Sequence, residues 1–98
     1  MNKWQQRLGN WLTNHLHLPS DTILNLPRIT TIGQFHAYIE NHRGLLIFKD
    51  EEIQLKTMQG VVVITGSDFV IKTLLPEEIL IEGTISTIHF IDSKNNEQ

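Results

Sequence analysis

The sequence predicts a small, mainly β domain: a β-sandwich-like fold of about seven short strands, preceded by an amphipathic helix at the N-terminus. Three observations predict this class. From Arg28 onward, apolar and polar residues alternate with the period of two that is typical of half-buried strands. Turn-forming residues interrupt the alternation about every 8–12 residues, as in small sandwiches. The length of 98 residues is enough for one such domain.

Residues 1–16 have the pattern of an amphipathic helix. At 100° per residue, one arc of about 140° collects the apolar side chains. Its members are Trp4, Leu8, Trp11, Leu12, His15 and Leu16. Lys3 and Arg7 lie among polar residues on the other side. Leu18 ends the segment, because a residue that precedes proline avoids the helical region.

The rest of the chain is expected to form short strands separated by turns. Residues 28–39 form one long strand, or two with a bend near Gly33. Residues 61–65 are β-branched, which places them in the middle of a covered sheet. Residues 79–91 form one or two strands, and a bulge near Ser86 would reconcile the two apolar faces of this segment. Further strands are expected at residues 45–48, 53–58 and 69–74, the last one after a turn at residues 66–68.

The predicted organisation has three parts, which are an amphipathic helix in residues 1–18, a β-rich domain in residues 19–91 and a polar tail in residues 92–98. The alternative to a sandwich is a short β-solenoid, in which successive strands stack like rungs. Glycine-centred turns at Gly44, Gly66 and Gly83 are spaced 22 and 17 residues apart, which is too irregular for a repeat. Pattern alone does not determine strand order, so both architectures stay open.

Charge is distributed unevenly along the chain. Eight Lys and Arg stand against eleven Asp and Glu, a net charge of −3. The part up to Gly44 carries +2 and the part after it −5. An acidic chain without a basic stripe argues against nucleic-acid binding, so we expect no nucleic-acid partner. The absence of cysteine excludes disulfides and thiol chemistry, and it fits a reducing, intracellular compartment.

Four of the five histidines are candidates for a metal site, but none of them has the spacing of metal ligands. On a helix His15 and His17 point about 200° apart, so the two cannot share an ion. His36 and His42 flank a turn, but no acidic pair stands at metal spacing beside them. We therefore expect no metal ion and no cofactor.

Catalytic residues are not expected either. A triad of Ser67, Asp68 and His36 lacks the Gly-x-Ser-x-Gly elbow that exposes a nucleophile, and the chain has no glycine-rich phosphate loop. Glu77 and Glu78 resemble a pair of catalytic acids, but they fit a solvated turn that opens with a proline. The sequence therefore predicts a protein that is not an enzyme.

The N-terminal helix is the best candidate for a functional surface. Its expected contact residues are Trp4, Arg7, Leu8, Trp11 and Leu12. These side chains could cover the open face of the protein's own sheet, as a two-layer fold requires. They could equally dock into a partner protein, where tryptophan is a favoured anchor, or lie in the headgroup region of an anionic membrane. Two cations make the electrostatic membrane contribution small, at about 1 kcal/mol each.

Four longer stretches of the sequence resemble one protein family. They are Leu26-Pro-Arg-Ile-Thr-Thr-Ile-Gly33, Tyr38-Ile-Glu-Asn-His-Arg-Gly44, Ile64-Thr-Gly-Ser-Asp-Phe-Val-Ile71 and Pro76-Glu-Glu-Ile-Leu-Ile-Glu-Gly83. With Arg7-Leu-Gly9 and Trp11-Leu-Thr-Asn14, the chain resembles the YabP/YqfC family of sporulation proteins of endospore-forming Firmicutes, closest to the YqfC branch. The resemblance spans roughly residues 3–91 and rests on the combination of stretches, since none of them is chemically diagnostic.

The resemblance implies a biological setting rather than a mechanism. Family members are small β-sandwich-like proteins made in the mother cell and needed for normal spore development. A cytoplasmic location, peripheral to the membrane around the forespore, follows as an expectation. YqfC-like proteins are encoded beside YqfD-like membrane proteins, which implies a membrane-embedded partner. The family offers no catalytic residue, cofactor or substrate to transfer.

The predicted function is therefore a non-enzymatic interaction module that docks a membrane-protein partner. The alternative is a self-assembling structural component of the developing spore, in which sheet edges pair between copies as a homo-oligomer.

Overall fold

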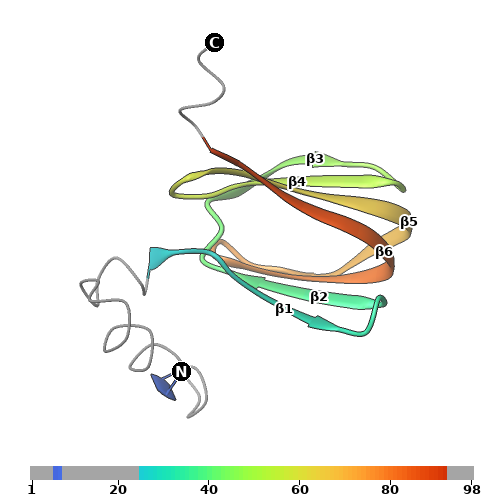
Figure 1. The fold of residues 1–98 in the computed structure, drawn as a ribbon, viewed down its shortest axis with the longest axis horizontal. Coiled ribbons are helices and arrows are strands. Elements are labelled where there is room, and N and C mark those ends of the chain that lie inside the picture. Colours follow the sequence, from blue (N-terminus) through green and yellow to red (C-terminus); the bar gives the residue numbers. More distant parts are fainter. Residues whose placement is uncertain (1–5, 8–24, 93–98) are drawn as a thin grey trace.

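The computed structural model describes residues 6–7 and 25–92, and residues 28–92 form one antiparallel sheet (Figure 1). Its strands are β1 (Arg28–Ile32), β2 (His36–Glu40), β3 (Gly44–Phe48), β4 (Glu52–Lys56), β5 (Gly60–Leu74) and β6 (Glu78–Asp92). Their order across the sheet is β1-β2-β6-β5-β4-β3, and every neighbouring pair is antiparallel. Consecutive strands are therefore neighbours except β2 and β3, which lie far apart in the sheet.

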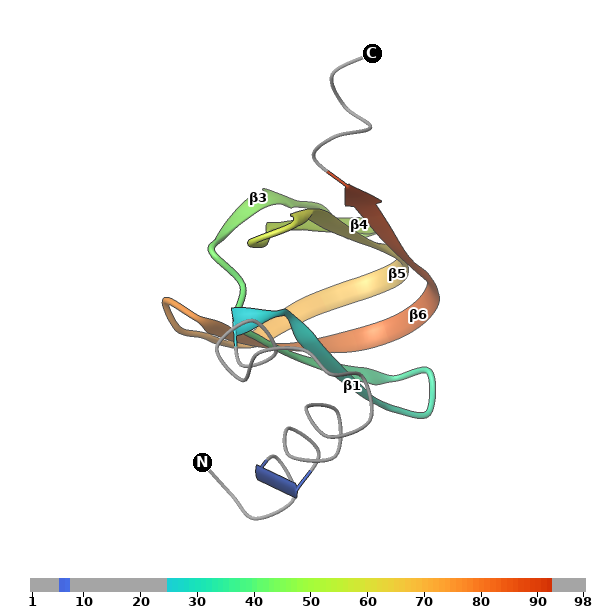
Figure 2. The same cartoon turned by 60° about the vertical axis from the view of Figure 1, so that its left-hand side comes forward.

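The two long strands bend the sheet so that one half turns over the other (Figures 1 and 2). β5 and β6 have 15 residues each, whereas each other strand has five. β2 pairs only with residues 78–82 of β6, and β4 pairs only with residues 61–65 of β5. The short strands are thus attached at opposite ends of the long hairpin, and the bend brings them together.

Apolar side chains from both halves of the sheet form one core. Its buried members are Ala37, Ile39, Ile53, Leu55, Val62, Ile64, Phe69, Ile79, Ile81 and Ile85. They belong to β2, β4, β5 and β6, so the sheet packs against itself as the layers of a sandwich do. Val63 is buried as well, although it is not part of this cluster. This burial confirms that residues 61–65 occupy a covered central strand.

Gly66 and Gly83 allow the hairpin to bend around Phe69. A Cβ atom on Gly66 would lie 1.9 Å from the carbonyl oxygen of Thr84, and one on Gly83 would lie 2.7 Å from the Phe69 ring. Gly83 also has a φ of +151°, which L side chains rarely adopt. The buried Phe69 ring occupies the space beside the two glycines and closes the core at the bend.

The turn predicted at residues 66–68 is wrong. These residues lie inside β5, where the register against β6 shifts between Ser67 and Val70 without a reversal of the chain. Residues 61–65 and 69–74 are therefore parts of one strand, and the sheet has six strands rather than about seven. Pairing with β6 continues on both sides of the bend, so glycine here permits bending instead of ending the strand. The solenoid alternative is also wrong, because all pairings are antiparallel.

The break predicted within residues 28–39 is confirmed in its two-strand form. β1 and β2 are joined by residues 33–35, and Gly33 has a φ of +55°. The bulge predicted near Ser86 is confirmed too, since Gly66 pairs with Ile85 whereas Thr65 pairs with Thr87. The extra residue in β6 changes the alternation, so that Ile88 packs against the core as Ile85 does.

His42 stabilises the connection between β2 and β3 through two hydrogen bonds of its ring. The Gly44 N–H donates a hydrogen bond to Nδ1 over 3.0 Å, and Nε2 lies 3.1 Å from the Leu75 carbonyl oxygen. Because Nδ1 accepts, Nε2 is assigned the proton and donates to Leu75. The ring is only 1% exposed, so both bonds are shielded from water. His42 thus ties the crossing to the turn between β5 and β6.

The predicted helix over residues 1–16 lies outside the described residues, apart from Gln6 and Arg7. These two residues have helical backbone and exposed side chains. The predicted polar tail is described only at Asp92, where β6 ends. In the described part of the chain, no helix has the length and apolar character needed to cross a membrane.

Candidate protein-interaction surface

Of the four candidate metal ligands, the structure describes His36 and His42, which have separate structural roles. His36 lies opposite Glu82 in the sheet, and its Nε2 is 3.2 Å from the Glu82 carboxylate. His42 is occupied by two backbone bonds at the strand crossing. Within residues 6–7 and 25–92, no group of three or more His, Asp or Glu side chains could hold a metal ion. His15 and His17 lie outside the described residues.

The residues that were considered as catalytic groups support the fold. Ser67 pairs with Thr84 at the bend, and Asp68 adopts a φ of 59° in the β5 irregularity, whereas His36 pairs with Glu82. The Glu77 carbonyl accepts hydrogen bonds from two backbone N–H groups at the strand crossing. The two acids thus have different contacts: the backbone of Glu77 supports the strand crossing, and the Glu78 carboxylate accepts a hydrogen bond from Tyr38.

Glu78 accepts a hydrogen bond from the Tyr38 hydroxyl, across two neighbouring strands. This bond raises the pKa of Tyr38 to about 12, and burial and the negative charges of Glu78 and Glu40 act in the same direction. The hydroxyl therefore stays protonated at neutral pH and serves as a donor.

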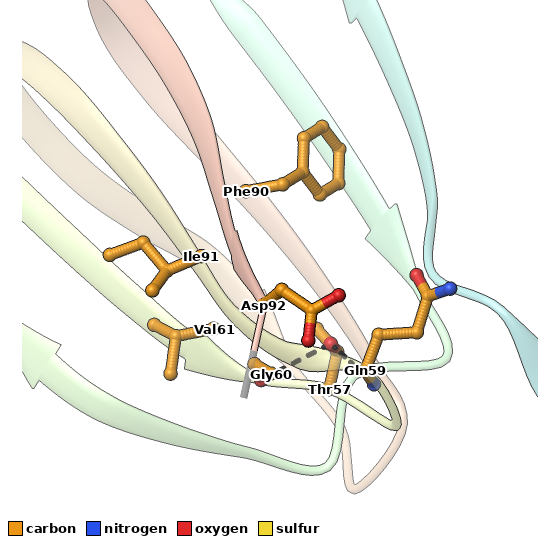
Figure 3. A pocket seen from close by; sticks show the side chains of 7 residues that line it. All are labelled: Thr57, Gln59, Gly60, Val61, Phe90, Ile91 and Asp92. Atoms are coloured by element: carbon orange, nitrogen blue, oxygen red, sulfur yellow. Dashed lines mark hydrogen bonds between the residues drawn. The ribbon is translucent and has the colours of Figure 1, made fainter. Parts of the chain in front are cut away.

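Among the described residues, two of the surface depressions lie on the hairpin. One, of about 130 Å³, lies where β6 ends (Figure 3), and its lining residues are Thr57, Gln59, Gly60, Val61, Phe90, Ile91 and Asp92. Small-molecule pockets usually have about 300–1,000 Å³, so this hollow is too small for that class of ligand. The other, of about 420 Å³, is an open depression along the β5–β6 turn at residues 75–78. One short turn cannot enclose a ligand, and we take both depressions as parts of a surface.

The bend leaves each long strand with one open edge. We define the β5 edge as residues 70–74 and the β6 edge as residues 86–92. Residues 70–74 pair with β6 alone, since β4 pairs with residues 61–65. Residues 87–92 pair with β5 alone, since β2 pairs with residues 78–82. Among the residues that the structure describes, no further strand is hydrogen-bonded to either edge.

The β5 edge has the features that protect a sheet from pairing with another chain. Its register against β6 shifts between Ile71 and Thr73, which makes Lys72 an extra, exposed residue in the strand. A second shift lies directly before it, between Ser67 and Val70. Bulges and lysine are two devices that natural sheets use against edge-to-edge association. This edge is therefore protected.

The β6 edge lacks such protection beyond its first residue. After the bulge at Ser86, residues 87–92 keep one register with β5, and they contain no lysine, arginine or proline. Phe90 is 65% exposed and Ile91 is 37% exposed. Because neighbouring side chains in a strand point to opposite faces, each face of this edge presents an apolar side chain. The β6 edge is thus an apolar strand able to accept another strand, and it is our candidate interaction surface.

The outermost strand β3 is less suitable as an interaction edge. Its register against β4 shifts between Leu45 and Ile47, which interrupts the edge.

Sequence reasoning placed the contact surface elsewhere. Of the five predicted contact residues, only Arg7 is described, and its side chain is exposed. Trp4, Leu8, Trp11 and Leu12 lie outside the described residues, so their role stays a prediction. From the sequence, Phe90 and Ile91 are ordinary strand residues. An apolar strand without lysine or proline was a visible signal, but only the strand order shows that this strand is an edge.

Fold and surface together define a small antiparallel β domain in which, among the described strands, the β6 edge lacks the features that protect a sheet edge. The YabP family model matches residues 25–97, a range that includes all six strands. Over 93 residues the chain is 50% identical to the uncharacterized protein YqfC of Bacillus subtilis (strain 168), which covers 95% of this chain and 100% of the relative. The chain therefore belongs to the YabP family, which confirms the resemblance found in its sequence.

Proposed function

We propose that the protein is a non-enzymatic sporulation protein of the mother cell, which acts as an interaction module during endospore formation. Its partner is a membrane-embedded sporulation protein of the YqfD-like kind, and the domain works on the cytoplasmic side, at the membrane around the forespore. Membership of the YabP family supports the setting. The β6 edge is the observation that carries the interaction role.

Strand addition is the binding mode that this edge favours. An extended segment of the partner would pair with residues 86–92, and main-chain hydrogen bonds would supply much of the affinity. Side chains would supply specificity, because Phe90 and Ile91 point to opposite faces and select apolar residues at alternate positions of the segment. The hollow beside Phe90 would receive one such side chain (Figure 3).

The N-terminal segment has a separate place in this proposal. Trp4 and Trp11 would anchor the domain in a groove of the partner or in the headgroup region of the membrane, with Arg7 beside them. The partner would then be held at two points, the sheet edge and the segment.

Co-purification of the full-length protein with the detergent-solubilised YqfD-like protein tests the proposal. We expect Phe90→Lys to reduce the recovered complex at least about tenfold, because it places a charge on an apolar strand. Val70→Lys on the protected β5 edge is the matched control, since Val70 is similarly exposed, and it should leave the complex intact. Equal recovery with both variants would remove the β6 edge from the proposal.

The contribution of the N-terminal segment is tested separately with Trp4→Ala combined with Trp11→Ala. Loss of the complex while the protein stays folded supports a contact through these side chains. Unchanged binding removes the segment from the interaction and leaves the sheet edge as its basis.

A second candidate function is a self-assembling component of the developing spore. The same open edge favours it, because an unprotected strand can pair with another copy as readily as with a different protein.

A further inference from the structure

We infer that, in the free protein, the N-terminal segment of residues 1–16 packs as a helix on the outer face of one layer of the sheet. This layer consists of β1, β2, the first part of β6 and the last part of β5. The inference goes beyond the proposed function, because it gives Trp4 and Trp11 a place before any partner is bound. Contact of these side chains with a partner would require their release from the sheet.

Side chains that alternate with the core residues define the outer face of this layer. In β2 and β6 the core residues are Ala37, Ile39, Ile79 and Ile81. Tyr38 and Leu80 lie between them in the sequence and are paired across the two strands. Because neighbouring side chains in a strand point to opposite faces, both point away from the core. Both are partly exposed.

Each strand of the layer contributes one apolar side chain to this face. Ile32 of β1 pairs with His36, and Val70 of β5 pairs with Glu82. Because His36 and Glu82 lie two residues from the pair described above, all of these side chains share the outer face. Ile32 is 69% exposed and Val70 is 51% exposed. We define the outer band as the four apolar side chains of this face, which are Ile32, Tyr38, Leu80 and Val70.

The length of the predicted helix matches the outer band, which crosses all four strands. Neighbouring strands lie about 4.8 Å apart, so the first and the last of four strands are separated by about 14 Å. A helix rises about 1.5 Å per residue, so its apolar arc from Trp4 to Leu16 extends over about 18 Å. One helix can therefore cover the band from β1 to β5. Among the described elements, which are the six strands of one sheet, none covers this face.

The connection to β1 brings the segment to this layer. β1 begins at Arg28 and is the outermost strand of the layer. Just before it, the Asn41 side-chain amide donates a hydrogen bond over 2.9 Å to the Leu26 carbonyl oxygen, which fixes the chain at the edge of the layer. The ten residues from Leu16 to Leu26 can extend over about 33 Å, so the segment can reach the whole outer face.

Polarity of the segment agrees with this position. A helix with an apolar stripe buries that stripe against another element, and here the stripe carries both tryptophans. Gln6 and Arg7 belong to the opposite, polar side, and both have helical backbone and exposed side chains. Three carboxylates surround the outer band, at Glu40, Glu78 and Glu82. Residues 1–20 carry two cations and no Asp or Glu, so charge favours the contact.

Tryptophan fluorescence of the purified full-length protein, without partner, tests the inference, because both tryptophans of the chain lie in the segment. We expect the folded wild-type protein to emit at shorter wavelength than the urea-unfolded protein, and acrylamide to quench it less. Ile32→Lys and Leu80→Lys each place a charge in the outer band, so both should move emission and quenching to the values of the unfolded chain. Met58→Lys, at a residue that is 52% exposed in the turn between β4 and β5, is the control and should resemble wild type.

The outcomes separate the possible occupants. Wild-type tryptophans as accessible as those of the unfolded chain would overturn the inference. Shielding that is lost on dilution would place the tryptophans between two copies and would also overturn it. Tryptophans that stay shielded in both Ile32→Lys and Leu80→Lys would overturn the position on the sheet. Ile32 is largely exposed, so Ile32→Lys should keep the fold, which circular dichroism verifies.

A nitroxide label gives a readout that leaves the outer band unchanged. The chain has no cysteine, so Thr73→Cys introduces a single thiol for the label. Thr73 pairs with Leu80 and therefore lies beside the band on the same face. Because a nitroxide quenches nearby fluorophores, the label at residue 73 should quench the tryptophans, and a label on Met58→Cys should not. Equal quenching by the two labels would contradict the inference.

The proposed function and this inference can fail separately. If the tryptophans of the free protein are exposed, the inference is wrong, while loss of partner binding in Phe90→Lys would still support the function. If the tryptophans are shielded on the outer band and Phe90→Lys still binds the partner, the inference holds and the function is wrong in its choice of surface.

Discussion

The β5 edge and the β6 edge belong to the same hairpin, but only the β5 edge is protected against pairing with another strand. Neither edge pairs with a further strand among the described residues, because the hairpin bends and each short strand reaches only one end of it. Both also expose large apolar side chains, with Leu74 49% exposed on one and Phe90 65% exposed on the other. Exposure alone therefore does not distinguish them.

Backbone regularity and charge make the difference. Lys72 interrupts the register of the β5 edge, while residues 87–92 of the β6 edge stay in register with β5 and carry their only charge at the last position. A regular edge accepts a second strand more readily than a bulged one does. The comparison shows that an interaction edge on a sheet is recognised by the absence of bulges and charged side chains as much as by the presence of apolar ones.

The largest loss of stability is expected from a substitution at the bend that creates both edges. Gly66→Ala should lower the free energy of unfolding by more than about 3 kcal/mol, because its Cβ atom would lie 1.9 Å from a backbone oxygen that cannot move aside. Urea denaturation measures the change. Gly44→Ala is the control: no atom lies within 4 Å of its Cβ position, so only the strain of a φ of +144° remains, at about 1 kcal/mol. Equal losses would show that the clash is not the cause.

Removal of the two His42 hydrogen bonds at the crossing from β2 to β3 should have the next largest effect on stability. His42→Ala would leave the Gly44 N–H and the Leu75 carbonyl without their ring partner, at a cost of about 2–4 kcal/mol in the free energy of unfolding. His36→Ala removes a half-exposed pair with Glu82 instead, which is worth less than about 1 kcal/mol. If His36→Ala lowered the free energy of unfolding as much as His42→Ala does, the stabilising role of the buried His42 ring would be contradicted.

The two edges themselves are compared with Phe90→Ala and Leu74→Ala. Both side chains are about half exposed or more, so each change should alter the free energy of unfolding by less than about 1 kcal/mol. Only Phe90→Ala should weaken the self-association that the second candidate function requires, because the β6 edge is the one of the two that favours a second strand. Light scattering at several concentrations measures the difference, and an equal effect of the two variants would erase the distinction between the edges.

The smallest effect is expected from Tyr38, which lies in β2 and belongs to neither edge. Hydrogen bonding to Glu78, with burial and nearby carboxylates, raises its pKa to about 12, so the folded protein holds the hydroxyl proton more firmly than the unfolded chain does. The stability from this bond is complete below pH 10 and is lost as the pH rises from about 10 to about 12. Tyr38 is the only tyrosine, so its ultraviolet absorbance reports the titration directly.

Tyr38→Phe provides the control for this window, since it should flatten the loss of stability between about pH 10 and 12 that belongs to the tyrosine. A wild-type titration midpoint at the ordinary value near 10 would contradict the hydrogen bond to Glu78.

Several elements of the fold could be predicted because their cause is local. The alternation of residues 28–39 and 79–91 identified strands, and the change of apolar face near Ser86 identified a bulge. The run at residues 61–65 identified a buried central strand. Glycine at residue 66 was misleading, since glycine is used both to end a strand and to bend one, and only continued pairing with β6 distinguishes the two.

The candidate site was not predictable in the same way. The sequence pointed to Trp4 and Trp11, because tryptophan on one face of a helix is a strong local signal. Phe90 and Ile91 look like core residues of any strand, and they become a surface because β2 is too short to cover them. Likewise, His42 is one of five histidines in the sequence. Its buried, hydrogen-bonded role follows only from the tertiary structure, where the chain crosses from β2 to β3.

The sequence by itself determined the mainly β class, most strand positions, the bulge at Ser86 and membership of the YabP/YqfC group, because period, turn residues and family stretches are properties of neighbouring residues. The tertiary structure alone decided the number of strands, their order and the bend around Phe69. It also decided which edge stays open. Edges depend on the relative lengths of strands that are distant in the chain, and no local pattern records that relation.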